Sequence, residues 1–229
     1  SSRTTRCWTW RTSSSRTTTL RAGPGYDLNA VCIRTDSSAN QDGHGLHVGA
    51  ASSSQQFRGL VTWDLSTIPA GQTVESVTMS LYVSNGSSSN ITVGLYAYNQ
   101  PFNESTATWS NTDFGAVGDL LTEATFYARQ GGNKYFASTP AFVDAANSAF
   151  DSGDPLGMML VSRSSMGAFT SFYSDDNYPP NRPQYAPALT LETREAQPPA
   201  PAPEPATMAA VALGAGGLGG YLRTRRRAA

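Results

Sequence analysis

The feature that most constrains the fold is a period-two alternation of apolar and polar residues in the middle of the chain. Residues 85–90 are rich in Ser and Asn and join two of the alternating segments as a predicted hairpin loop. Such alternation is typical of strands that bury one face. The apolar positions are Phe57, Gly59, Val61, Trp63 and Leu65, then Val77, Met79, Leu81 and Val83, and then Ile91, Val93, Leu95 and Ala97.

Evenly spaced short strands without helical crossovers predict an all-β fold, an antiparallel jelly-roll-like β-sandwich. One short helix interrupts the pattern. Ser138 or Thr139 can cap it, Pro140 suits its first turn, and Gly153 ends it. We expect this helix to close one end of the sandwich. Further strands are predicted at residues 30–35, 45–49, 156–162, 168–174 and 187–193.

Composition divides the chain into four parts. Residues 1–24 carry five Arg, no acid and mostly Ser and Thr, and they are predicted to be a disordered or mis-annotated low-complexity segment. Residues 25–195 form the predicted sandwich, and their balance of charge is −9. Residues 196–202 are a Pro/Ala-rich linker to a tail at 203–229. The acidic body argues against a nucleic-acid-binding surface, because phosphate contacts need clustered Lys and Arg.

The tail combines three features in a fixed order. Pro203, Glu204 and Pro205 precede an apolar stretch of 17 residues, and an arginine cluster closes it. A spanning helix needs about 20 apolar residues, and many of these 17 are Ala or Gly, so the stretch suits a temporary membrane stop. A buried helix or a disordered tail are the alternatives. The arginines, which we expect on the cytoplasmic side, are Arg223, Arg225, Arg226 and Arg227.

This order of motif, hydrophobic segment and arginines resembles the PEP-CTERM sorting signal of bacterial surface proteins. The resemblance implies recognition by a membrane-embedded exosortase and removal of the hydrophobic tail. It also implies export to the cell surface or extracellular matrix of an outer-membrane bacterium, with transient anchoring in the inner membrane by the C-terminal helix. Because residues 1–24 contain no apolar signal segment, we expect the natural chain to start elsewhere.

The body resembles the DNRLRE domain over roughly residues 28–193. The resemblance implies a jelly-roll sandwich of a kind in which some members are carbohydrate-binding modules for acidic algal or matrix polysaccharides. Phe102 stands where that family has tryptophan, and residues 126–135 match poorly. The matching landmarks are residues 41–49, 57–71, 77–83, 102–111, 142–160 and 172–189.

Several residues that suggest catalysis are better explained by structure. No second acid or base is fixed near Glu104, so we expect it to satisfy backbone groups at a strand edge, with Trp109 in the core. Trp63 and Asp64 are expected to be core and turn. The chain has no Gly-x-Ser-x-Gly elbow, so the sequence predicts no enzyme.

Metal sites and disulfides have weak support in the sequence. Cys7 and Cys32 could pair in an oxidising compartment, but Cys7 lies in the low-complexity segment. His44 and His47 would point to opposite faces of a strand, so they do not make a zinc site. The cofactor prediction is none, with calcium left open. The oxygen ligands of such a calcium site would be Asp36, Asn40 and Asp42, which ordinary turn chemistry explains equally well.

A polar and aromatic segment near the end of the body is the predicted ligand-binding surface. Aromatic rings stack on sugars, and carboxylates bind sugar hydroxyls. The alternative is that the tyrosines cover the core edge and the arginine pairs with an aspartate. The negative charge of the body would repel a polyanionic glycan unless a local arginine or a bridging cation intervened. The predicted residues are Tyr173, Asp175, Asp176, Tyr178 and Arg182.

Together these features predict a secreted, surface-sorted, non-catalytic protein that binds or organises extracellular polysaccharide. A structural matrix or cell-surface protein without a glycan site is the alternative. A polysaccharide lyase or hydrolase would need a groove with converging acid and base residues. The expected partners are an exosortase-like processing enzyme, extracellular polysaccharide and the membrane through the tail, but not nucleic acid.

Overall fold

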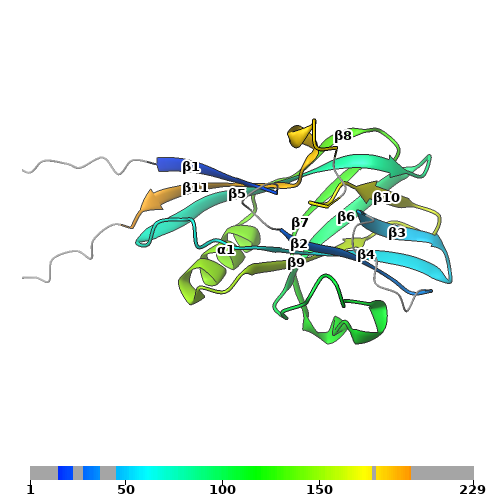
Figure 1. The fold of residues 1–229 in the computed structure, drawn as a ribbon, viewed down its shortest axis with the longest axis horizontal. Coiled ribbons are helices and arrows are strands. Elements are labelled where there is room, and N and C mark those ends of the chain that lie inside the picture. Colours follow the sequence, from blue (N-terminus) through cyan, green and yellow to red (C-terminus); the bar gives the residue numbers. More distant parts are fainter. Residues whose placement is uncertain (1–14, 23–27, 37–44, 177–178, 197–229) are drawn as a thin grey trace, which may run out of the picture. The chain divides into compact units, whose positions relative to one another are not determined.

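The computed structural model of the protein describes residues 15–22, 28–36, 45–176 and 179–196. Over these residues the chain forms an all-β, sandwich-like fold in which every strand pairing is antiparallel. The strands continue from one layer to the other through the pairing of β3 with β4 (Figure 1). The first layer contains β1 (Ser15–Arg21), β3 (Leu46–Ser52), β5 (Gln72–Gly86), β8 (Gly132–Phe136), β10 (Phe169–Phe172) and β11 (Ala188–Glu195). The second contains β2 (Asn29–Arg34), β4 (Gln55–Trp63), β6 (Asn90–Tyr98), β7 (Val117–Tyr127) and β9 (Leu156–Ser162).

The main core lies between the two layers and confirms the alternation predicted for β4, β5 and β6. Most of the predicted apolar residues of these strands belong to it, whereas Phe57 is half-buried outside it and Leu60 and Tyr98 belong to a second cluster. The largest fully buried side chains of the main core are aromatic. Burial at this scale supplies the main favourable free energy of folding, about 25 cal/mol for each Å² of apolar surface removed from water. The aromatic members are Trp63, Phe136, Phe142 and Phe172.

A second, smaller cluster lies on the outer face of the second layer. Leu60 and Met159 are fully buried there although they face away from the main core. The connection between β6 and β7 covers them and includes two short helical turns, η1 (Trp109–Asn111) and η2 (Phe114–Ala116). The outer face of this layer is therefore partly occupied by the protein's own chain.

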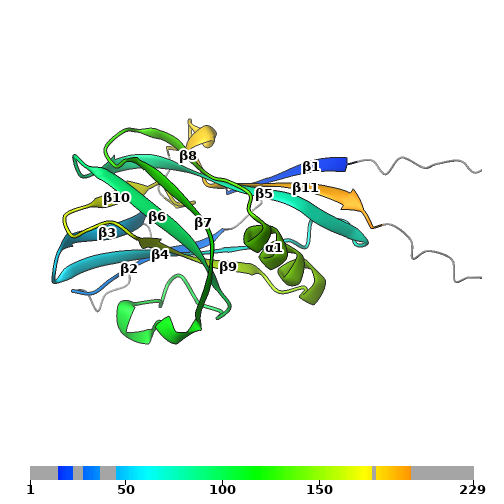
Figure 2. The ribbon, with the colours of Figure 1, turned by 180° about the vertical axis from the view of Figure 1, so that it is seen from behind.

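The predicted helix is α1 (Pro140–Ser152), which packs against β5, β7 and β9 (Figure 2). Its start is capped as expected, because the Thr139 hydroxyl accepts a hydrogen bond from the Phe142 amide at 3.1 Å. Gly153 ends it in the left-handed conformation, with φ of 75°. Phe142 and Ala146 form its buried face.

Three strands were not predicted. Strand β1 lies in the segment expected to be disordered, so that prediction is wrong for residues 15–21. These residues pair along their whole length with β11, and Leu20 is buried in the main core. Strands β7 and β8 were also missed, because β7 does not alternate regularly between buried and exposed positions and β8 has only five residues.

The predicted tail lies outside the described residues, and so do residues 1–14. The linker beyond Ala196, the sorting motif at Pro203, Glu204 and Pro205, and the hydrophobic sorting helix all fall there. Within the described part of the chain, no helix has the length and apolar character needed to cross a membrane.

Candidate functional site

Three tyrosines from separate segments meet on the outer face of the first layer. Tyr82 points outward from β5, because its neighbours Leu81 and Val83 are buried in the core. The Tyr82 ring stacks on the Tyr185 ring, with centroids 3.8 Å apart. Tyr173 follows β10, and its ring lies 5.9 Å from Tyr82 and 5.7 Å from Tyr185. All three are half-buried, and we call them the tyrosine cluster.

Backbone and arginine contacts fix the positions of these rings. The Tyr173 amide donates to the Tyr82 carbonyl at 3.1 Å, which continues the pairing between β10 and β5. Tyr185 belongs to the short turn η3 (Pro183–Tyr185), the gold coil above β5 in Figure 1. From β1, Arg21 Nη1 donates to the carbonyls of Pro183 and Ala186 at 3.3 and 3.4 Å. Thus β1 helps to hold the turn that carries Tyr185.

The hydroxyl of Tyr185 is the electrostatic centre of the cluster. Arg182 Nη1 donates to it at 2.6 Å, and the Arg182 guanidinium lies 5.3 Å from the ring centroid. Hydrogen bonds from Tyr82 and then Arg182 lower the pKa of Tyr185. The same bond to Tyr185 is the largest cause that raises the pKa of Tyr82. The Tyr185 hydroxyl therefore accepts the hydrogen bond from Arg182.

The structure brings together only part of the predicted surface. Tyr173 belongs to the cluster and Arg182 contacts it through Tyr185, whereas Tyr178 lies outside the described residues. Asp175 and Asp176 lie in the turn after Tyr173, where Asp175 is half-buried and Asp176 is exposed. Sequence reasoning missed Tyr82 and Tyr185. The outward position of Tyr82 was available from the alternation of β5, but that of Tyr185 depends on the fold of a loop.

The predicted calcium ligands are only partly described. Both oxygens of Asp36 are engaged, since Arg34 Nε lies 2.5 Å from one and Gln55 Nε2 donates to the other at 3.1 Å. Asn40 and Asp42 are not among the described residues. Within the described ranges, no group of three or more His, Cys, Asp or Glu side chains could hold a metal ion. A calcium site at residues 36–42 stays a prediction.

Residues that resembled catalytic groups have structural roles. Glu104 Oε2 accepts a hydrogen bond from the Ala30 amide at 3.0 Å, as expected for a carboxylate that satisfies a strand edge. Trp109 is half-buried, so it does not fill the main core; it packs beside Phe114 against the second cluster. Trp63 is fully buried in the main core, as predicted.

Of the histidines and cysteines considered in the sequence, the structure describes His47 and Cys32. His47 Nδ1 lies 2.8 Å from Ser171 Oγ, and its ring contacts Phe57 at 5.6 Å, so His47 is partnered. Cys32 is a free, buried thiol. His44 and Cys7 lie outside the described residues.

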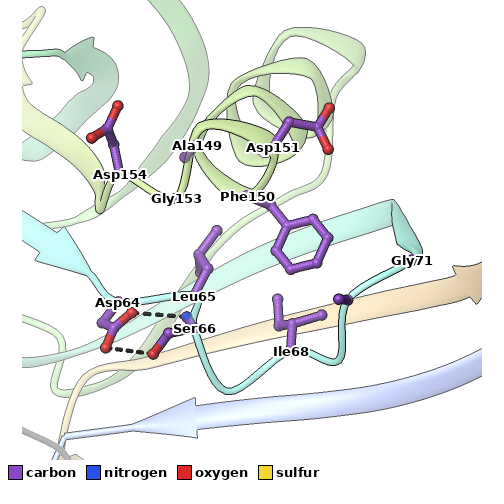
Figure 3. A pocket seen from close by; sticks show the side chains of 11 residues that line it. Asp64, Leu65, Ser66, Ile68, Gly71, Ala149, Phe150, Asp151, Gly153 and Asp154 are labelled. Carbon is purple, nitrogen blue, oxygen red and sulfur yellow. Dashed lines mark hydrogen bonds between the residues drawn. The ribbon is translucent and has the colours of Figure 1, made fainter.

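An open hollow of about 390 Å³ lies between the β4–β5 connection and the end of α1 (Figure 3). Leu65, Ile68 and Phe150 give it an apolar lining, and Asp151 and Asp154 stand at its helical side. The carboxylate of Asp64 accepts from the Ser66 amide and hydroxyl, both at 2.8 Å, which confirms its predicted turn role. The titratable side chains among the lining residues are the carboxylates of Asp64, Asp151 and Asp154.

Comparisons with known proteins identify the family of this chain. A family model, carbohydrate-binding module family 96, matches residues 35–185. No curated protein sequence matches the chain. One solved structure with some likeness is the K1 cleaved adhesin domain of Lys-gingipain from Porphyromonas gingivalis W83. It has 13% sequence identity and a TM-score of 0.23, over 82% of this chain and 99% of that chain. Because the family model matches more than half of the chain, the chain belongs to carbohydrate-binding module family 96.

Proposed function

We propose that the protein binds extracellular polysaccharide through the tyrosine cluster and carries out no chemical step on it. The observation that supports this most strongly is the convergence of three half-exposed tyrosine rings on one sheet face in a chain of a carbohydrate-binding family. Tyrosine combines an apolar ring with a polar tip, so it can stack on the C–H face of a sugar and bind a hydroxyl group.

Charge bears on which polysaccharide fits. Residues 25–195 carry a balance of −9, so a polyanionic chain approaches against a repulsive field. Arg182 is the cation in contact with the cluster, and its guanidinium is already bonded to Tyr185. A neutral polysaccharide, or an acidic one bridged by calcium, therefore suits the surface better than a free polyanion.

The proposal includes export and sorting through the C-terminal tail. Its support is the order of Pro203, Glu204 and Pro205, the apolar stretch and the arginine cluster. An exosortase-like enzyme would cut at this tail after transient anchoring in the inner membrane. In a host that expresses the full chain, Glu204→Ala should leave the protein membrane-associated and uncut, as measured by mass spectrometry. Normal release of this variant would contradict the sorting proposal.

Retention in polysaccharide gels tests the binding proposal. The full chain is run in native gels that contain hydroxyethylcellulose, galactomannan, xylan or alginate, each with calcium and with a chelator. We expect slower migration in at least one gel relative to a gel without polysaccharide. If none retards the protein under either condition, the binding proposal is wrong and the structural-protein alternative takes its place.

A further inference from the structure

We propose that Tyr135 is a second sugar-stacking platform beside the tyrosine cluster, so that the face binds an extended stretch of polysaccharide that covers both. This inference rests on the proposed function and adds to it the length of the ligand. It concerns an exposed ring that neither the predicted surface nor the tyrosine cluster includes.

Strand pairing places Tyr135 on the same face as the cluster. On β8, Tyr135 lies opposite Ser80 and Asn133 lies opposite Tyr82. Side chains two residues apart on a strand share a face, and diagonal neighbours on paired strands are roughly 7–8 Å apart. Tyr135 is thus the diagonal neighbour of Tyr82, one strand further from the rest of the cluster.

The next residue fixes the direction of this ring. Phe136 is fully buried in the main core, opposite Met79, so Tyr135 must point to the outer face. A one-residue slip of β8 would bury the Tyr135 hydroxyl and expose the Phe136 ring, and both changes cost free energy. The position of Tyr135 is therefore set by the packing of its neighbour.

Exposure distinguishes Tyr135 from the cluster tyrosines. Its side chain is 62% exposed, whereas the cluster rings are half-buried against one another. Within the described part of the chain, no aromatic ring packs against Tyr135. A large aromatic surface left in water on a defined strand is available to stack on a ligand.

The surface between the tyrosine cluster and Tyr135 is polar. Asn133 is exposed beside Tyr82, and Ser80 is half-buried beside Tyr135. An amide and a hydroxyl can each donate to and accept from sugar hydroxyls. A single sugar reaches one platform only, while a longer chain gains the second contact as an intramolecular step at high effective concentration.

The test measures affinity against ligand length. The probes are the four gel polysaccharides and size-separated oligosaccharides from partial hydrolysis of any that retains the full chain. The variants are Tyr135→Ala, Tyr135→Phe and Tyr185→Ala. Tyr127→Ala is the matched control, because Tyr127 is 43% exposed but lies on β7 in the other layer. Thermal melting checks that each variant is folded.

We expect the affinity of the wild-type chain to rise with oligosaccharide length until both platforms are covered. Tyr135→Ala should bind short oligosaccharides as the wild type does and long ones about 2- to 12-fold more weakly, the range that one aromatic contact supplies. Tyr135→Phe should retain the gain, and Tyr127→Ala should behave as wild type.

Two results would overturn the inference in distinguishable ways. If Tyr135→Ala matches the wild type at every length while Tyr185→Ala loses binding, the second platform is wrong and the proposed function stands. If no gel retains the wild-type chain, both proposals are wrong.

Discussion

At the scale of single residues, the Tyr185 hydroxyl gives the clearest chemical signature of the cluster. Hydrogen bonds from Tyr82 and Arg182 both stabilise its phenolate, so its pKa lies below the ordinary tyrosine value of 10.0 and that of Tyr82 lies above it. We therefore expect the Tyr185 phenolate to form at a lower pH than that of an ordinary tyrosine. The near-ultraviolet absorbance of phenolate, followed during an alkaline titration, measures this.

Variants can assign the step at the lowest pH in that titration to Tyr185. Tyr185→Phe should remove the earliest step, and Arg182→Gln should move it to higher pH, because one of the two stabilising bonds is gone. Tyr135→Phe is the control and should leave the earliest step in place. A Tyr185→Phe variant that keeps the earliest step would contradict the arrangement of the cluster.

Cys32 provides a second test at this scale. It is 2% exposed on β2, and burial raises the pKa of its thiol to about 12. In a Cys7→Ser background, we expect Cys32 to resist a thiolate-specific disulfide reagent at about pH 8. In concentrated urea the thiol should react with the ordinary pKa of an exposed cysteine. Rapid labelling of the native protein would show that β2 is not packed as described.

At the scale of elements, β1 is the strand whose place in the fold most needs a direct test. Leu20 is 5% exposed in the main core, while Thr17 on the same strand is exposed. We expect Leu20→Ala to lower the free energy of unfolding by about 2–5 kcal/mol, the usual cost of a truncated core leucine. Urea denaturation measures this, and Thr17→Ala is the matched control.

Equal stability of the two variants would mean that residues 15–21 do not belong to the sandwich.

The predicted loss in Leu20→Ala would also weaken the support that Arg21 gives to η3, because both residues are on the same strand. Stability and glycan binding should therefore fall together in that variant.

Elements with a local signal could be predicted from the sequence. Strands β4, β5 and β6 alternate because one face meets the main core, and α1 carries its own cap and stop. Strand β1 has only Leu20 as an apolar strand residue, so its place depends on pairing with β11, which lies far away in the sequence. Long-range pairing of this kind leaves little trace in local pattern.

The same distinction explains the candidate site. Tyr173 and Arg182 are in a polar aromatic segment that the sequence shows directly. Tyr82 comes from a core strand, and Tyr185 from the η3 turn, which Arg21 of the unpredicted strand helps to hold. The contacts of Tyr82 and Tyr185 with Tyr173 could therefore not be inferred without the fold.

At the scale of the whole folded body, the two layers differ in what covers them. The β6–β7 connection partly covers the outer face of the second layer. Its Trp109 and Phe114 rings pack over the second cluster, and the Arg58 guanidinium lies over both rings. The outer face of the first layer carries the tyrosine cluster and Tyr135 instead. This difference explains why we place ligand binding on the first layer.

The most direct test of this assignment is retention of a Tyr82→Ala, Tyr185→Ala double variant in the polysaccharide gel that retards the wild-type chain most. The account predicts that the double variant migrates as it does without polysaccharide, while remaining folded by thermal melting, and that Tyr127→Ala is retarded like the wild type. Undiminished retardation of the folded double variant would contradict a binding site at the tyrosine cluster.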